Sequence, residues 1–149
     1  CANYFTFTFV RNPWDRAVSA YHYLLSGGAH KRDEKWAKLV KKYNSFDDFV
    51  LQWVCHKNVQ KIIHFVPQIK FIESGDGSVD LDYVGRFEDI DSDLSEINCL
   101  LNCDENAVLK LSRKKVSNRG DYRDYYSKES SEVIANVYSR DISIFGYIF

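Results

Sequence analysis

Aromatic and hydroxyl side chains alternate at the start of the chain, where residues 4–10 read YFTFTFV. A period of two is typical of a β-strand, so we predict a strand over Tyr4–Val10. A second largely apolar run predicts a strand over Leu81–Phe87. Two shorter runs, Ile69–Ile72 and Val108–Leu111, predict two short strands.

Apolar positions then recur with helical spacing. Asn12 suits the residue that caps a helix, and Pro13 suits its first turn. Gly27 and Gly28 are predicted to end this helix. We also expect helices over residues 31–43 and 90–101, from Ser45 to about Val54, and from Ser127 onward. The predicted apolar faces comprise Trp14, Ala17, Val18, Tyr21, Leu24 and Leu25; Trp36, Leu39 and Val40; Ile90, Leu94, Ile97 and Leu101; and Val133, Ile134, Val137, Tyr138 and Ile142.

Strands that alternate with helices predict an α/β fold with a mostly parallel sheet. We expect Tyr4–Val10 to be an interior strand and Leu81–Phe87 to lie in the same sheet. No repeat or linker interrupts the pattern, which favours a single domain over residues 1–149. Ligands of such sheets bind beyond the carboxyl ends of the strands, which is where Arg11 stands.

Charge is unevenly distributed although the net charge is only -1. Residues 11–43 carry a net +5, residues 73–106 a net -10 and residues 110–128 a net +5. This pattern fits an anionic ligand held from two sides, although charge alone favours the simpler interpretation of solvated helix faces. A pI near 6.5 argues against a general nucleic-acid binder. The longest apolar run is too short to span a membrane.

The four cysteines, Cys1, Cys55, Cys99 and Cys103, form no CxxC pair. No histidine lies at zinc-finger spacing from them, so we predict no metal site. We interpret the cysteines as reduced thiols.

Arg11, Asn12 and Ser19 form the most informative local pattern. Arg11 leaves a strand directly before a helix whose first N–H groups carry a partial positive charge. The guanidinium could add a forked contact to a phosphate at this helix start. Ser19 lies two turns into the helix, and helical side chains lean back toward the N-terminus. The alternative is a surface arginine with a small serine packed against a neighbouring helix.

The segment that contains this pattern, FTFVRNPWDRAVSAY, resembles the 3′-phosphate-binding motif of sulfotransferases that use 3′-phosphoadenosine 5′-phosphosulfate (PAPS). Four later segments resemble the carbohydrate-type branch of that family: HFVPQ at 64–68, YVGRFED at 83–89, YRDYY at 122–126 and DISIFGY at 141–147. The resemblance implies a three-layer, P-loop NTPase-like fold. It also implies transfer of a sulfuryl group from PAPS to a hydroxyl, here predicted to belong to a carbohydrate.

By this resemblance, Arg11 and Ser19 bind the 3′-phosphate, Phe87 lies near the adenine, and Arg119 and Gly120 lie in a loop that closes over the phosphate. The histidines are weak candidates for a catalytic base. We place His64 and Gln68 at the edge of the substrate cleft.

The chain lacks the loop with Gly, Lys and Ser or Thr that the family uses for the 5′-phosphosulfate. We therefore expect the catalytic residues upstream of Cys1, in a strand-loop-helix unit that precedes this segment. The 149 residues alone are expected to be inactive and, with an unpaired sheet edge, to self-associate. The alternative is a non-catalytic nucleotide-binding or structural module. In the eukaryotic lumenal relatives a cysteine pair stands where this chain has Gln68-Ile69-Lys70. Together with the reduced thiols, this difference favours a bacterial or viral protein of the cytoplasm; a eukaryotic protein would be expected in the Golgi lumen.

Overall fold

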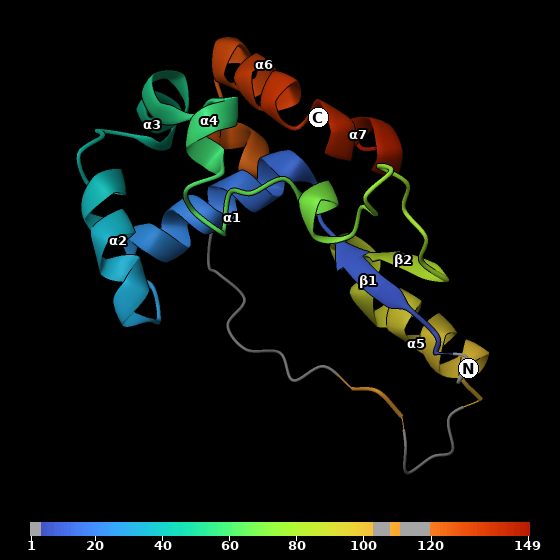
Figure 1. The fold of residues 1–149 in the computed structure, drawn as a ribbon. Helices are drawn as coiled ribbons and strands as arrows, with labels where there is room; N and C mark the ends of the chain where they lie inside the picture. Colours follow the sequence, from blue (N-terminus) through green and yellow to red (C-terminus); the bar gives the residue numbers. More distant parts are fainter. Residues whose placement is uncertain (1–3, 103–107, 111–119) are drawn as a thin grey trace. The chain divides into compact units, whose positions relative to one another are not determined.

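The computed structural model describes residues 4–102, 108–110 and 120–149. It is a mixture of helices and a small parallel sheet, in agreement with the predicted α/β class. The chain divides into two compact units, which Figure 1 shows as ribbons. Unit 1 comprises residues 1–11 and 72–117, and unit 2 comprises residues 12–71 and 118–149. The expectation of one sulfotransferase domain stays a prediction.

Unit 1 is built on two parallel strands, β1 (Phe7–Val10) and β2 (Tyr83–Arg86), which pair in the register Phe7↔Tyr83 to Val10↔Arg86. Both predicted strands are therefore present and share a sheet, although each is shorter than predicted. Asp82 ties the start of this pair together, since its carboxylate accepts from the Thr6 N–H (2.7 Å) and hydroxyl (2.8 Å). The sheet has two strands in the described part of the chain, so an interior place for β1 stays a prediction.

A short 3-10 helix, η3 (Phe87–Asp89), leads from β2 into α5 (Ile90–Leu100). The Tyr83 hydroxyl donates to Glu96 at 2.9 Å, and the backbone N–H of Arg86 donates to the Asp93 carboxylate. These side chains bind α5 to β2. Of the four apolar residues predicted to face inward on this helix, Ile97 is fully buried, Ile90 and Leu94 are half-buried, and Leu101 is exposed.

The ring of Phe9, which pairs with Gly85 across the sheet, explains why residue 85 has no side chain. The Phe9 ring occupies the space beside Gly85, and a Cβ atom there would lie 2.7 Å from two carbons of that ring. The same Cβ would lie 3.1 Å from the Asp93 carboxylate. A side chain at this position therefore cannot fit without moving Phe9 or α5.

We expect Gly85→Ala to destabilise β1 and β2 by about 1–3 kcal/mol, the usual cost of overpacking. Hydrogen exchange of the strand amides measures this local opening. Gly75→Ala is the matched control in the same unit, because no atom lies within 4 Å of its Cβ position. Equal exchange rates in the two variants would contradict the role of the Phe9 contact.

Unit 2 is helical and surrounds α1 (Pro13–Leu25). Its other elements are η1 (Lys31–Asp33), α2 (Glu34–Val40), α3 (Phe46–Trp53), α4 (His56–Val59), η2 (Gln68–Phe71), η4 (Tyr122–Tyr125), α6 (Lys128–Val137) and α7 (Ser139–Phe145). The predicted helix starts at Ser45 and Ser127 are confirmed, since the Ser45 hydroxyl accepts from Asp48 N–H and the Ser127 hydroxyl from Ser130 N–H. Gly27 and Gly28 follow α1 with φ of 105° and 71°, values that favour glycine.

Aromatic side chains fill the core of unit 2. Phe49 lies at the centre, stacked on Trp53 with 5.1 Å between ring centroids. The rings of Tyr21 and Phe65 lie 5.3 and 5.4 Å from it. Three separate segments of the chain, α1, α3 and the segment before η2, therefore share one hydrophobic core.

The predicted strand Ile69–Ile72 is wrong, because Gln68–Phe71 forms the 3-10 helix η2. The carboxylate of Asp141, a fully buried residue of α7, accepts from the backbone N–H groups of Gln68 (2.7 Å) and Ile69 (3.0 Å). In a sheet, these two backbone N–H groups would donate to a neighbouring strand. Here they donate to the side chain of Asp141, which lies 72 residues beyond Ile69 in the sequence.

Two other predictions need correction. The helix predicted from Ser127 is two helices, α6 and α7, which meet at Tyr138. Tyr138 is buried and its hydroxyl donates to the Phe65 carbonyl at 2.6 Å, so a tertiary contact coincides with the break. Residues 108–110 form no strand, and Leu111 lies outside the described residues.

Candidate functional site

Arg11 and Phe87 meet at the carboxyl edge of the parallel strands in unit 1. The register pairs Val10 with Arg86, so Arg11 and Phe87 are the next residues on neighbouring strands. The Arg11 guanidinium lies over the Phe87 ring, 4.4 Å from its centroid. This cation–π contact orients a half-buried arginine at the edge where ligands of such sheets bind.

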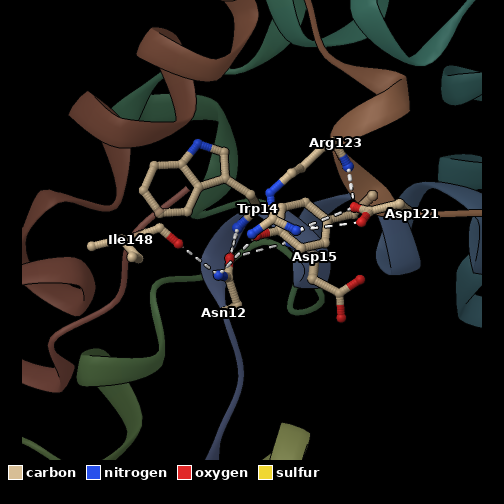
Figure 2. Close-up of polar contacts among 7 residues, drawn as sticks. Asn12, Trp14, Asp15, Asp121, Arg123 and Ile148 are labelled. Atoms are coloured by element: carbon tan, nitrogen blue, oxygen red, sulfur yellow. Dashed lines mark hydrogen bonds and ion pairs between the residues drawn. The ribbon is translucent and has the colours of Figure 1, made fainter.

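Asn12 caps α1 in unit 2, as the sequence predicts. Its Oδ1 accepts from the N–H groups of Trp14 (3.0 Å) and Asp15 (3.4 Å), and its Nδ2 donates to the Ile148 carbonyl at 3.0 Å. Figure 2 shows these contacts around the first turn of α1. One buried side chain therefore fixes both the start of this helix and the C-terminal segment.

The YRDYY segment packs against the start of α1. The Tyr122 hydroxyl accepts from Asn12 Nδ2 at 3.3 Å, and the Tyr126 hydroxyl donates to the Trp14 carbonyl at 2.9 Å. The Arg123 guanidinium lies 4.5 Å from the centroid of the Tyr122 ring and 3.4 Å from Asp121, an ion pair drawn in Figure 2. The sequence does not predict the hydrogen bonds of these two tyrosines, because their partners lie 110 and 112 positions away in the chain.

Ser19 is half-buried on α1, so it belongs to unit 2, whereas Arg11 belongs to unit 1. The boundary between the units in this part of the chain falls between Arg11 and Asn12. Convergence of Arg11 and Ser19 on one phosphate stays a prediction. Arg119 lies outside the described residues, and Gly120 is exposed.

His64 and Gln68 both lie in unit 2 and have different surroundings. His64 Nε2 lies 3.4 Å from the Asp33 carboxylate, and its ring stands edge-on to Tyr23 with 4.8 Å between centroids. Gln68 is held through its backbone by Asp141. The structure thus adds Asp33 and Tyr23 to the residues around His64, although no spacing in the sequence indicates either.

The described cysteines, Cys55 and Cys99, are free and exposed, in keeping with reduced thiols. Within residues 4–102, 108–110 and 120–149, no group of three or more His, Cys, Asp or Glu side chains is placed to hold a metal ion. None of the helices in this part of the chain is long and apolar enough to cross a membrane.

Comparison with known proteins identifies one family. A model of the sulfotransferase family matches residues 1–148. Searches of curated proteins and of solved structures returned no match.

Proposed function

The chain belongs to the sulfotransferase family, and from this premise we propose that it transfers a sulfuryl group from PAPS to a carbohydrate hydroxyl. In this reaction the acceptor oxygen forms a bond to sulfur while the bond between sulfur and the bridging phosphate oxygen breaks. Adenosine 3′,5′-bisphosphate leaves with the electron pair, and the hydroxyl proton passes to a base. Family membership supports sulfuryl transfer, whereas the donor and the acceptor are part of the proposal.

The observation that carries the donor proposal is the place of Arg11. It directly follows β1 and precedes the capped start of α1, a helix of 13 residues. A helix start and a bidentate guanidinium both favour a phosphate dianion. We assign Arg11 and Ser19 to the 3′-phosphate of PAPS.

Phe87 is our candidate for the adenine contact. Arg11 covers one face of its ring, and the residue is 47% exposed, which leaves surface on which a base can stack. We assign Arg119 and Gly120 to a segment that closes over the same phosphate. We place His64 and Gln68 on the acceptor side, and we propose a cytoplasmic location on the basis of the free thiols Cys55 and Cys99.

Calorimetry with the full-length protein tests the donor proposal. Adenosine 3′,5′-bisphosphate should bind at least about tenfold more tightly than adenosine 5′-phosphate, since charge-assisted hydrogen bonds to the extra phosphate contribute about 1.5–3 kcal/mol. Equal affinities would refute a 3′-phosphate site. Tight binding without transfer of labelled sulfate from PAPS to a glycan such as unsulfated chondroitin would favour the non-catalytic module.

A further inference from the structure

Four lysines follow one line along the outer side of residues 31–42, which run through η1 and α2 in unit 2. They are Lys31, Lys35, Lys38 and Lys42, all of them exposed. Spacings of four, three and four residues place these side chains on one face of a helix. The buried residues Asp33, Ala37 and Val40 have the same spacing and mark the opposite face, toward the core. We call the four lysines the lysine surface.

The positive charge of the lysine surface has little to offset it on the same segment. Residues 31–42 include six basic residues and two acidic ones, Asp33 and Glu34. Asp33 is 6% exposed and accepts hydrogen bonds from the Tyr23 hydroxyl (2.7 Å) and the His30 backbone N–H (3.2 Å). Glu34 is therefore the only exposed carboxylate among residues 31–42, all of which the structure describes.

Local helix stability does not account for these lysines. Positive charge is favourable near the end of a helix and unfavourable near its start, yet Lys31 lies in η1 and Lys35 in the first turn of α2. Like charges four residues apart also repel each other. On α6, by contrast, the exposed residues Lys128 and Glu132 have opposite charges at that spacing, as is typical of a solvated helix face. An anionic partner would relieve the repulsion within the lysine surface.

One charge of the lysine surface is held in place before any partner binds. The Lys35 ammonium lies over the ring of the half-buried Trp36, 4.3 Å from its centroid. This cation–π contact restricts the lysine side chain, so less conformational entropy is lost when Lys35 contacts an anion.

The dimensions of the lysine surface suit a polymer. A helical rise of 1.5 Å per residue separates Lys31 from Lys42 by about 16 Å. The segment also follows the end of α1, whereas the phosphate ligand Arg11 precedes its start, and α1 itself spans about 20 Å. A line of charges of this length fits a chain of repeated anionic groups better than one small anion such as the donor nucleotide.

Three observations favour an acidic polysaccharide as that polymer. The line consists of lysines, which act as point charges, whereas arginine forks are better suited to the phosphates of nucleic acids. A helix that binds in a membrane surface needs an exposed apolar face, and here that face, with Ala37 and Val40, is buried in the core. Asp33 on the inner side lies 3.4 Å from His64, which we have assigned to the acceptor side.

We propose that the lysine surface binds an acidic polysaccharide through the carboxylates or sulfates that such a chain carries at regular intervals. The choice of a polysaccharide rests on the proposed function, in which a carbohydrate is the acceptor. The surface holds the body of the chain, separately from the residues assigned to the donor, and keeps acceptor hydroxyls at a high local concentration. Its contribution decreases as salt screens the charges.

Calorimetry with the full-length protein and unsulfated chondroitin, in the absence of PAPS, tests this surface directly. The double variant Lys35→Glu, Lys38→Glu should weaken binding by at least about tenfold, because it removes two attractive charges and adds two repulsive ones. The matched control is Lys57→Glu, Lys61→Glu, which reverses two exposed lysines of the same unit at a similar spacing. The control should bind nearly as tightly as the wild type. An equal loss in both variants would indicate a general effect of net charge and would overturn the proposal.

A stability measurement distinguishes lost binding from lost structure. Lys35→Glu places a negative charge in the first turn of α2, where it is favourable, so the double variant should be at least as stable as the wild type. If its Tm is lower, Lys31→Gln combined with Lys42→Gln replaces it, since both positions lie away from Trp36. Unchanged chondroitin affinity in that second, folded variant would overturn the proposal.

Phosphatidylserine vesicles and a single-stranded DNA oligonucleotide serve as the competing polyanions. At equal ionic strength, both should bind more weakly than chondroitin, and chondroitin binding should fall steeply as salt is added. Tighter binding of the vesicles or of the DNA, lost in the double variant Lys35→Glu, Lys38→Glu, would overturn the choice of a polysaccharide.

The outcomes separate this inference from the function on which it rests, because chondroitin binding needs neither PAPS nor transfer. Failure to bind adenosine 3′,5′-bisphosphate, with chondroitin still bound through the lysines, would overturn the donor proposal and support the lysine surface. Normal binding of the bisphosphate, with chondroitin affinity unchanged in the double variant, would overturn the lysine surface alone.

Discussion

Replacing Arg11 with alanine should weaken the binding of adenosine 3′,5′-bisphosphate by about ten- to a hundredfold. The lost interaction is a charge-assisted hydrogen bond of roughly 1.5–3 kcal/mol, and about 1.4 kcal/mol corresponds to one decade of affinity. Arg11→Lys should restore only part of the loss, because an ammonium lacks the planar fork of donors. Ser19→Ala should cost less, roughly 0.5–1.5 kcal/mol, as expected for a neutral hydrogen bond. Calorimetry on the full-length variants measures each value.

Two controls make this result specific to the 3′-phosphate. Adenosine 5′-phosphate should bind the wild type and Arg11→Ala equally weakly. Arg32→Ala removes the same charge from an exposed position of η1 and should leave the affinity unchanged. If a folded Arg11→Ala variant binds the bisphosphate as tightly as the wild type, Arg11 is a surface arginine that packs on Phe87 and the phosphate assignment is wrong.

Replacing Asp141 with alanine should lower the free energy of unfolding by about 2–6 kcal/mol, at about 1–3 kcal/mol for each of the two backbone donors left without an acceptor. The reason is that the Gln68 and Ile69 N–H groups, which donate to this carboxylate at 2.7 and 3.0 Å, would lose their acceptor inside the protein. Unfolding in urea, followed by circular dichroism, measures the change.

Asp141→Asn should be less harmful, because its single amide oxygen can still accept from one of the two N–H groups. Glu132→Ala on α6 is the control for loss of a carboxylate at an exposed position and should change stability by no more than about 0.5 kcal/mol. An unfolding free energy of Asp141→Ala close to that of Glu132→Ala would show that Asp141 does not hold η2.

The predictions that were confirmed rest on interactions between residues that are close in the sequence. Asn12 and Ser127 cap helices because a short polar side chain reaches the N–H groups two or three residues ahead. Gly27 and Gly28 end α1 because they adopt positive φ without strain. Such effects depend on neighbours in the sequence, so they can be read without a structure.

The predictions that failed depend on residues far apart in the chain. Gln68–Phe71 has apolar residues suited to a strand, yet Asp141 takes its backbone donors and stabilises a 3-10 helix. The apolar pattern after Ser127 continues through Tyr138, yet the hydrogen bond from Tyr138 to Phe65 coincides with a break between α6 and α7. Burial and hydrogen bonding with a distant partner outweigh local preference in both cases.

The features of the candidate site also divide into those that the sequence predicts and those that only the structure shows. By itself the sequence determined the order of strand, Arg11, helix cap and Ser19, together with the segments that place the chain in its family, because each depends on local spacing. Only the tertiary structure decided that Phe87 lies against Arg11, that Tyr122 and Tyr126 bind the start of α1, and that Asp33 and Tyr23 orient His64. The physical reason is that these contacts join segments 31 to 112 residues apart, whose meeting depends on how the core packs rather than on any local pattern.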